Sequence, residues 1–300
     1  MVKHFLDISD FNKIELRKIL NFAKKIKKKQ IQNKNISILK NKSLGLLFEK
    51  QSTRTRLSFS VGMQKIGGNI VELEGSKIGF GTREKDEDML KVMSQYLDAL
   101  MIRNDNHKQL INLASLNILP IINGLSNYSH PCQILSDIFT IEECLGKIEN
   151  KKIVWLGDAN NVLISLIHSA EIFNFRLNIL VPASLLIKLK KIFKNYNFKY
   201  TFFCKNFDLA LNNADCVMTD AWISMGEKMV KEKKNILKKY QVNKNIMQKS
   251  KKNSIFMHCL PAHRNEEVTD EVIDGPQSVV WQQAQNRMYV QQSILNYLIK

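Results

Sequence analysis

The chain has 300 residues and a formal net charge of +17, with 45 lysines and arginines against 28 aspartates and glutamates. This length is enough for a large hydrophobic core and suits two domains of ordinary size. No apolar run approaches the length of a transmembrane helix, and the N-terminus lacks the apolar stretch of a signal peptide. We therefore expect a cytoplasmic protein with no membrane partner.

The basic excess raises the possibility of a nucleic-acid-binding module. Its distribution argues against that class, because the lysines are spread over helical faces, as at residues 24–29, 188–191 and 231–234. Aromatic residues are not interleaved with them as they are in base-stacking surfaces. We expect a solvated surface that attracts anionic substrates and no nucleic-acid partner. Salt-dependent retention on a phosphate polymer, without catalysis, would favour the nucleic-acid alternative.

The five cysteines are scattered, odd in number and without a C-x-x-C pair. This pattern argues against a disulfide framework and against a zinc site. We expect most of them to be small buried hydrophobic residues. Only Cys259 lies in a motif, and no metal or redox cofactor is predicted.

After an opening helix at about Lys13–Gln30, the chain reads strand, polar turn, helix around residues 44–66. The turn contains Ser-Thr-Arg-Thr-Arg at residues 52–56, and Ser52 is a suitable N-cap residue. The other N–H groups of the first helical turn lack intrahelical partners, and together with the helix dipole they favour an anion. The alternative is a capped helix with solvated arginines, but the number of donors favours anion binding.

The two arginines of this turn differ in direction. Arg54 and Arg56 are two positions apart on a helix, so they point to nearly opposite faces. We assign the anion to Arg54 and expect Arg56 to lie along the helix flank or to meet a carboxylate.

Further strands are predicted at residues 69–73, 98–103 and 119–124, with a polar loop at 74–85 and a helix at 84–97. Arg103 ends a strand, and in open α/β sheets ligands bind at the carboxyl ends of the strands. The alternative to ligand binding is that Arg103 is an ordinary surface arginine at a strand end.

His130 precedes a proline that starts a helix through Cys144. The positive end of the helix dipole disfavours protonation there, so a neutral imidazole can donate to a carbonyl oxygen. Gln133, one turn later, can accept from an NH2 group. From the sequence spacing alone, a purely structural role for His130 is as well supported as a role in ligand binding.

From residue 152 onward, strand and helix segments alternate, with strands near 152–157, 177–181, 200–203, 216–219 and 255–258. This alternation predicts a second doubly wound parallel sheet, with the domain boundary near Leu135. No G-x-G-x-x-G motif follows Gly157, so a dinucleotide is not favoured.

Asp220 ends one of these strands and suits an ammonium ion, although an acidic turn residue is the alternative. Asn161 is either a ligand residue or a helix cap. A polar, lysine-rich loop with Ser224 and Met225 is predicted to run to a helix near Asn243. Cys259 as a covalent nucleophile is disfavoured, because no histidine and orienting partner are evident.

The motif at residues 52–56 resembles the carbamoyl-phosphate signature of the aspartate and ornithine carbamoyltransferases. His-Pro-x-Gln at 130–133, the segment at 220–226 and His-Cys-Leu-Pro at 258–261 resemble the ornithine branch. The resemblance implies an α/β protein of two Rossmann-like, doubly wound parallel-sheet domains. Residues 1–134, with the C-terminal helix 286–300 packed back on them, would bind carbamoyl phosphate, and residues 135–285 would bind ornithine.

The resemblance also implies the reaction: carbamoyl transfer from carbamoyl phosphate to the δ-amine of L-ornithine, giving L-citrulline and phosphate in arginine biosynthesis. The implied carbamoyl-phosphate ligands are Ser52, Thr53, Arg54, Thr55, Arg103, His130, Gln133, Cys259, Leu260 and Arg287. The implied ornithine ligands are Asn161, Asp220, Ser224 and Met225, and the implied catalytic residues are Arg54, Arg103, His130 and Cys259. A homotrimer is also implied. Putrescine, an acetylated ornithine and aspartate are alternative acceptors.

Two positions depart from the family pattern. Gln51 stands where the family usually has proline, which restores a backbone N–H and loosens the turn. Lys77 stands where the ornithine branch commonly offers glutamine or histidine to a neighbouring subunit. A lysine there can contact phosphate but cannot accept a hydrogen bond.

Overall fold

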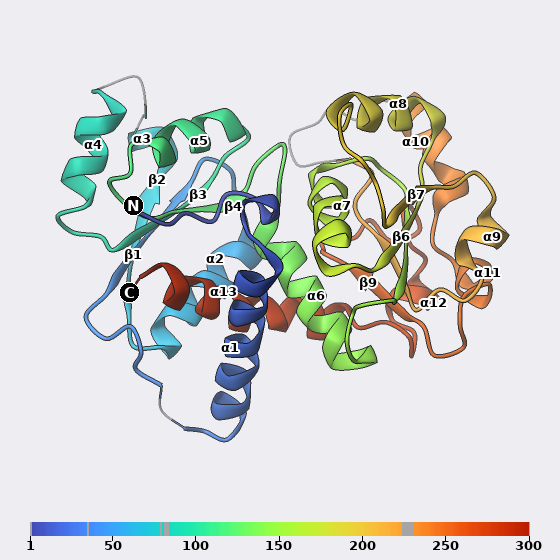
Figure 1. Ribbon diagram of the computed structural model, residues 1–300, viewed down its shortest axis with the longest axis horizontal. Coiled ribbons are helices and arrows are strands. Elements are labelled where there is room, and N and C mark those ends of the chain that lie inside the picture. Colours follow the sequence, from blue (N-terminus) through green and yellow to red (C-terminus); the bar gives the residue numbers. More distant parts are fainter. Residues whose placement is uncertain (1, 35, 79, 81–83, 224–230, 300) are drawn as a thin grey trace. The chain divides into compact units, whose positions relative to one another are not determined.

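The computed structural model describes residues 2–34, 36–78, 80, 84–223 and 231–299 (Figure 1). The chain forms two compact units: unit 1 comprises Met1–Ser136 and Gln285–Lys300, and unit 2 comprises Asp137–Ala284. The chain passes from unit 1 to unit 2 within α6 (Pro131–Leu145) and returns within α13 (Val280–Leu298).

Unit 1 contains a parallel sheet in the order β2-β1-β3-β4. Its strands are β1 (Ser43–Phe48), β2 (Asn69–Glu74), β3 (Ala99–Arg103) and β4 (Ile121–Leu125). The inner strands are continuous apolar runs that are buried on both faces, as parallel strands usually are. The strand order reverses between β1 and β3, so the carboxyl ends of these two strands form a switch point where α/β sheets bind ligands.

The helices of unit 1 cover both faces of this sheet, with α4 and α5 on one side and α1, α2 and the end of α13 on the other (Figure 1). They are η1 (Ile8–Asp10), α1 (Lys13–Ile31), α2 (Thr53–Lys65), α3 (Gly75–Ile78), α4 (Asp86–Met93) and α5 (His107–Ser115). α2 packs against α13 at Gly62, beside the side chains of Met288 and Gln292. Gln292 in turn donates to the Gly62 carbonyl at 2.9 Å.

Unit 2 contains a five-stranded parallel sheet in the order β7-β6-β5-β8-β9, with its switch point between β5 and β8. Its strands are β5 (Lys152–Leu156), β6 (Arg176–Leu180), β7 (Thr201–Phe203), β8 (Cys216–Thr219) and β9 (Ile255–His258). Its helices are α7 (Asn161–Phe173), α8 (Ala183–Ile192), α9 (Phe207–Leu211), α10 (Lys231–Leu237), η2 (Lys238–Tyr240), α11 (Lys244–Gln248) and α12 (Asp270–Ile273).

The predicted class, two doubly wound parallel α/β sheets, is confirmed, and three local expectations are wrong. The helix expected at 84–97 ends at Met93, because tight turns then lead the chain into β3. The polar loop expected at 74–85 includes the short helix α3. The loop expected before Asn243 includes α10. The last residue of this helix, Leu237, is fully buried in the core of unit 2.

All five cysteines are free. Cys132 and Cys216 are buried, and burial raises the pKa of the Cys132 thiol to about 12. The other three are half-buried, so the expectation that most cysteines are buried is wrong. Among the helices of the described ranges, none combines the length and apolar character needed to cross a membrane.

Candidate functional site

The start of α2, directly after β1, presents free backbone donors. Ser52 is the N-cap, as predicted, and its hydroxyl accepts from the Thr55 N–H at 3.3 Å. The N–H groups of Thr53 and Arg54 donate to no group in the described part of the chain. These two donors and the helix dipole make this end of α2 suitable for an anion.

Two guanidinium groups meet at the next residue of this turn. The Thr55 hydroxyl accepts from Arg103 at 3.0 Å and from Arg287 at 2.9 Å, and all three residues are at least 94% buried. Arg103 comes from the carboxyl end of β3, opposite Phe48 of β1, whereas Arg287 comes from α13. Two positive charges that converge on one buried hydroxyl match a multiply charged anion.

The two arginines of α2 diverge, as predicted. Arg56 forms an ion pair with Glu72 of β2, and its guanidinium lies 4.8 Å from the centre of the Phe48 ring. Arg54 is half-buried and forms no hydrogen bond or ion pair with any residue that the structure describes. Its charge is therefore available to a ligand at the start of the helix.

His130 lies immediately before α6 and is only 3% exposed. Its carbonyl accepts from the N–H groups of Gln133 and Ile134 in the first turn. Burial lowers the pKa of His130 well below its usual value, and the positive charges of Arg287 and Arg103 lower it further. The imidazole is therefore neutral, as expected, but the cause is burial and the two arginines and not the helix dipole on which the prediction rested. Gln133 is also buried.

The turn that carries His130 is fixed by buried polar groups. The Ser126 hydroxyl accepts from the Ser129 N–H at 3.2 Å, and the Asn123 amide donates to the Ser129 carbonyl at 3.3 Å. Ser126 also contacts Nδ1 of His107 at 2.8 Å. This network lets the short segment before His130 hold one conformation.

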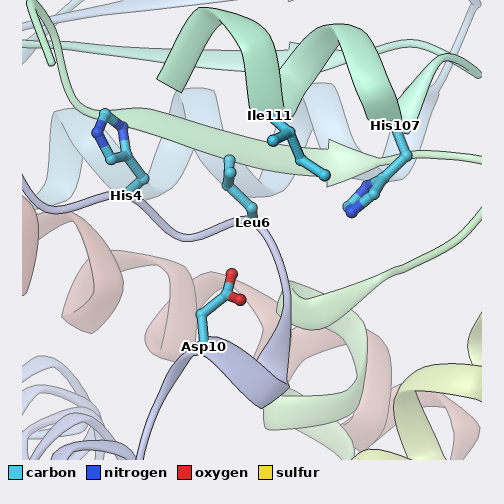
Figure 2. Close-up of a pocket in the computed structure, with 5 residues that line it drawn as sticks. All are labelled: His4, Leu6, Asp10, His107 and Ile111. Atoms are coloured by element: carbon cyan, nitrogen blue, oxygen red, sulfur yellow. The ribbon is translucent and has the colours of Figure 1, made fainter. Parts of the chain in front are cut away.

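His107 also lines a surface pocket of about 360 Å³ (Figure 2). The residues around the pocket are His4, Leu6, Asp10, His107 and Ile111. None of the residues predicted to bind substrate lines this pocket. In unit 1, the predicted residues at the start of α2 and Arg103 lie instead at the carboxyl ends of β1 and β3.

The lowered pKa of His130 predicts a pH-dependent stability. In the unfolded chain a histidine takes up a proton below about pH 6.5, whereas buried His130 does not, so the free energy of unfolding decreases as the pH falls through that value. Urea unfolding at a series of pH values should show a smaller decrease for His130→Gln than for the unmodified protein. Parallel curves for the two proteins would contradict the assignment of a neutral His130.

In unit 2, polar groups gather at the carboxyl ends of β5 and β8. The Asp220 carboxylate is 8% exposed and accepts from the Asn160 amide at 2.6 Å and from the Cys259 thiol at 2.7 Å. Asn160 also caps α7, because its side-chain oxygen accepts from the N–H groups of Val162 and Leu163. The helix start and the Asp220 carboxylate are therefore held by one side chain.

Sequence reasoning missed Asn160. It placed the choice between ligand and cap at Asn161, but Asn160 is the cap and Asn161 is the first residue of α7. The available signal was the pair of asparagines after a buried strand, since either asparagine is a suitable N-cap residue. The capping alternative for Asn161 is therefore wrong.

The His258-Cys259-Leu260 segment ends β9 in a constrained turn. Leu260 has a φ of +58°, a left-handed conformation that is rare for a non-glycine residue. Its N–H donates to His258 Nδ1 at 2.9 Å, and His258 Nε2 lies 3.3 Å from the fully buried Glu267. His258 therefore has a structural role, because it fixes the backbone at Leu260.

This arrangement also bears on metal binding and on nucleophilic catalysis. Asp220, His258 and Cys259 bring ligand atoms within 4.8 Å of one another. However, both ring nitrogens of His258 already have partners, Leu260 and Glu267, so the ring does not offer a lone pair to a metal or act as a base for Cys259. The Cys259 thiol instead donates to Asp220.

The predicted residues thus fall into two groups, one in each unit. Unit 1 contains Ser52, Thr53, Arg54, Thr55, Arg103, His130, Gln133 and Arg287. Unit 2 contains Asn161, Asp220, Cys259 and Leu260. Ser224, Met225 and the side chain of Lys77 lie outside the part of the chain that the structure describes.

Two family models together cover most of the chain. Residues 3–143 match the carbamoyl-P binding domain of aspartate/ornithine carbamoyltransferase, and residues 149–298 match its Asp/Orn binding domain. The ornithine carbamoyltransferases of Bradyrhizobium diazoefficiens and Rhodopseudomonas palustris are each 45% identical to this chain. The alignments cover 98% of this chain and 96% of the first relative, and 100% and 97% for the second.

Solved structures agree with these matches. The ornithine carbamoyltransferase of Burkholderia thailandensis superposes with a TM-score of 0.91 at 36% identity and covers 99% of both chains. That of Pyrococcus furiosus gives a TM-score of 0.91 at 38% identity and covers 99% of this chain and 97% of its own. The chain therefore belongs to the aspartate/ornithine carbamoyltransferase family.

Proposed function

We propose that this chain transfers the carbamoyl group of carbamoyl phosphate to the δ-amine of L-ornithine, producing L-citrulline and phosphate. The observation that carries the proposal is the opposite charge of the two switch points. In unit 1, two buried guanidinium groups meet at Thr55 beside the start of α2, which suits a phosphate. In unit 2, the buried Asp220 carboxylate has neutral donors as partners, which suits an ammonium group.

For carbamoyl phosphate, we assign the phosphate to the backbone and hydroxyl groups of residues 52–55 and to Arg54, Arg103 and Arg287. Neutralisation of the phosphate stabilises it as a leaving group. Neutral His130, with Arg54, donates to the carbonyl oxygen as negative charge develops on it. The Gln133 side chain and the Leu260 carbonyl accept from the carbamoyl NH2 group.

For L-ornithine, we assign the α-ammonium group to Asp220, with Asn161, Ser224 and Met225 as further ligands. Cys259, hydrogen-bonded to Asp220, would lie near the δ-amine. The δ-amine must be uncharged to attack the carbonyl carbon, so one carboxylate in the site is enough to balance the single cation of the reactive substrate.

A screen of acceptors with carbamoyl phosphate as the only donor tests this proposal. We expect colorimetrically detected citrulline with L-ornithine and little product with putrescine, N-acetylornithine or L-aspartate. Asp220 favours an acceptor with a free α-ammonium group, which N-acetylornithine lacks. Putrescine keeps an equivalent ammonium group but lacks the α-carboxylate, and L-aspartate lacks the δ-amine. Preferred turnover of another acceptor would contradict the proposal.

We extend the proposal to the cellular setting and assembly. We propose that the protein is a homotrimer, that it is located in the cytoplasm and that it acts in arginine biosynthesis. Membership of this family supports each of these proposals. We also propose that residues 1–134 with 286–300 form the carbamoyl-phosphate domain and that residues 135–285 form the ornithine domain. The division into units at Ser136/Asp137 and Ala284/Gln285 supports these boundaries.

A further inference from the structure

A second buried carboxylate, Asp158, follows the strand next to that of Asp220. Asp158 lies two residues after β5, Asp220 lies directly after β8, and the two strands are paired in parallel through Trp155 and Met218. The Trp155 indole donates to the Asp158 carbonyl at 2.8 Å and fixes the backbone there. Both carboxylates therefore leave the sheet at the same edge.

The two carboxylates have different partners. Asp158, whose side chain is 5% exposed, forms an ion pair of 3.0 Å with Lys233 of α10. Asp220 accepts from an amide and a thiol, and no cationic side chain of the described ranges forms an ion pair with it. Among the described residues, Lys233 thus balances the charge of Asp158, whereas Asp220 has no cationic partner.

We propose that Lys233 is a positioning residue for the acceptor: by neutralising Asp158, it makes Asp220 the cation-binding carboxylate at this edge of the sheet. This inference rests on the proposed function and adds a specificity-determining ion pair to it. The reactive form of L-ornithine has one ammonium group, so a site with one unbalanced carboxylate binds it in one orientation.

The consequence of losing Lys233 follows from the charges. Asp158, a buried carboxylate, would then lose a cationic partner, which is costly, and its charge would repel the neighbouring charge of Asp220. The substrate ammonium would be drawn towards either carboxylate, and the doubly protonated, unreactive form of ornithine would gain affinity. Both effects weaken productive binding of L-ornithine.

The test is a set of variants assayed for citrulline. Lys233→Met should raise the KM for L-ornithine by roughly 10-fold or more, the change that one pKa unit of charge interaction produces. The KM for carbamoyl phosphate should not change. Lys233→Arg keeps the charge and should behave as the unmodified enzyme. The double variant Lys233→Met with Asp158→Asn removes the unbalanced charge and should regain most of the affinity for L-ornithine.

Lys234 provides the matched control, because it is the next lysine of α10 and pairs with Glu266 instead. Lys234→Met should leave both KM values unchanged. An unchanged KM for ornithine in Lys233→Met, or a double variant no better than the single one, would overturn the inference. Thermal unfolding of each variant and calorimetric titration with L-ornithine show whether lost activity reflects weaker binding or lost folding. Absence of citrulline synthesis by the unmodified enzyme would instead refute the proposed function.

Discussion

Replacing Arg54 by alanine should reduce turnover by about 100-fold or more, the usual cost of losing one preorganised donor to a developing oxyanion. Arg54 lies in the first turn of α2, beside the unpaired N–H groups of the helix start, and its guanidinium pairs with no residue that the structure describes. Its positive charge is therefore available to a ligand at the helix start. Steady-state kinetics with saturating L-ornithine and carbamoyl phosphate measure the effect.

Arg56→Ala is the matched control for this experiment. Arg56 has the same charge and lies on the same helix, but it is engaged by Glu72 and the Phe48 ring. We expect turnover close to that of the unmodified enzyme, with at most a small loss of stability, because exposed ion pairs contribute about 1 kcal/mol or less. Near-normal turnover in Arg54→Ala, or equal losses in both variants, would show that the anion is not bound at this helix start.

The second large effect is expected for Asp220→Asn. This change keeps the size of the side chain but removes the charge that we assign to the substrate ammonium group. The KM for L-ornithine should rise on the order of 100-fold, as for loss of one partner of a buried charge pair. The KM for carbamoyl phosphate should remain unchanged, because the residues assigned to that substrate's phosphate lie in unit 1.

Asp215→Asn serves as the control on the same segment. Asp215 precedes β8, at the end of the strand opposite Asp220, and it binds Lys251 at 2.6 Å and the Lys152 N–H at 2.8 Å. Its replacement should lower the unfolding temperature without a selective effect on ornithine. If Asp220→Asn weakened both substrates equally, the assignment of the phosphate and of the ornithine ammonium group to separate groups of residues would be wrong.

Local chemistry explains why parts of the site were predictable from sequence. The capped start of α2 depends on residues within three positions of Ser52, and the divergence of Arg54 and Arg56 follows from helical geometry alone. The strands that carry Arg103 and Asp220 are short apolar runs, which parallel sheets bury on both faces. In each case the signal and the structure it specifies are a few residues apart.

Other parts depended on contacts between distant segments. Arg287 reaches Thr55 across 232 positions of sequence, which no periodicity in α13 indicates. Asn160 rather than Asn161 meets Asp220, because α7 begins between the two asparagines. In the sequence, nothing distinguishes Lys233 from the neighbouring lysines. Only the folded structure shows that it forms an ion pair with Asp158.

The amino-acid sequence by itself therefore determined the two parallel sheets, the capped start of α2 and the family to which the chain belongs. The tertiary structure alone decided which charged side chains face one another: Arg103 with Arg287 at Thr55, and Lys233 with Asp158. The physical reason is range. Capping, helical spacing and apolar runs act between near neighbours in the chain, whereas the partner of a buried charge is chosen by whichever segment the packed fold brings within reach.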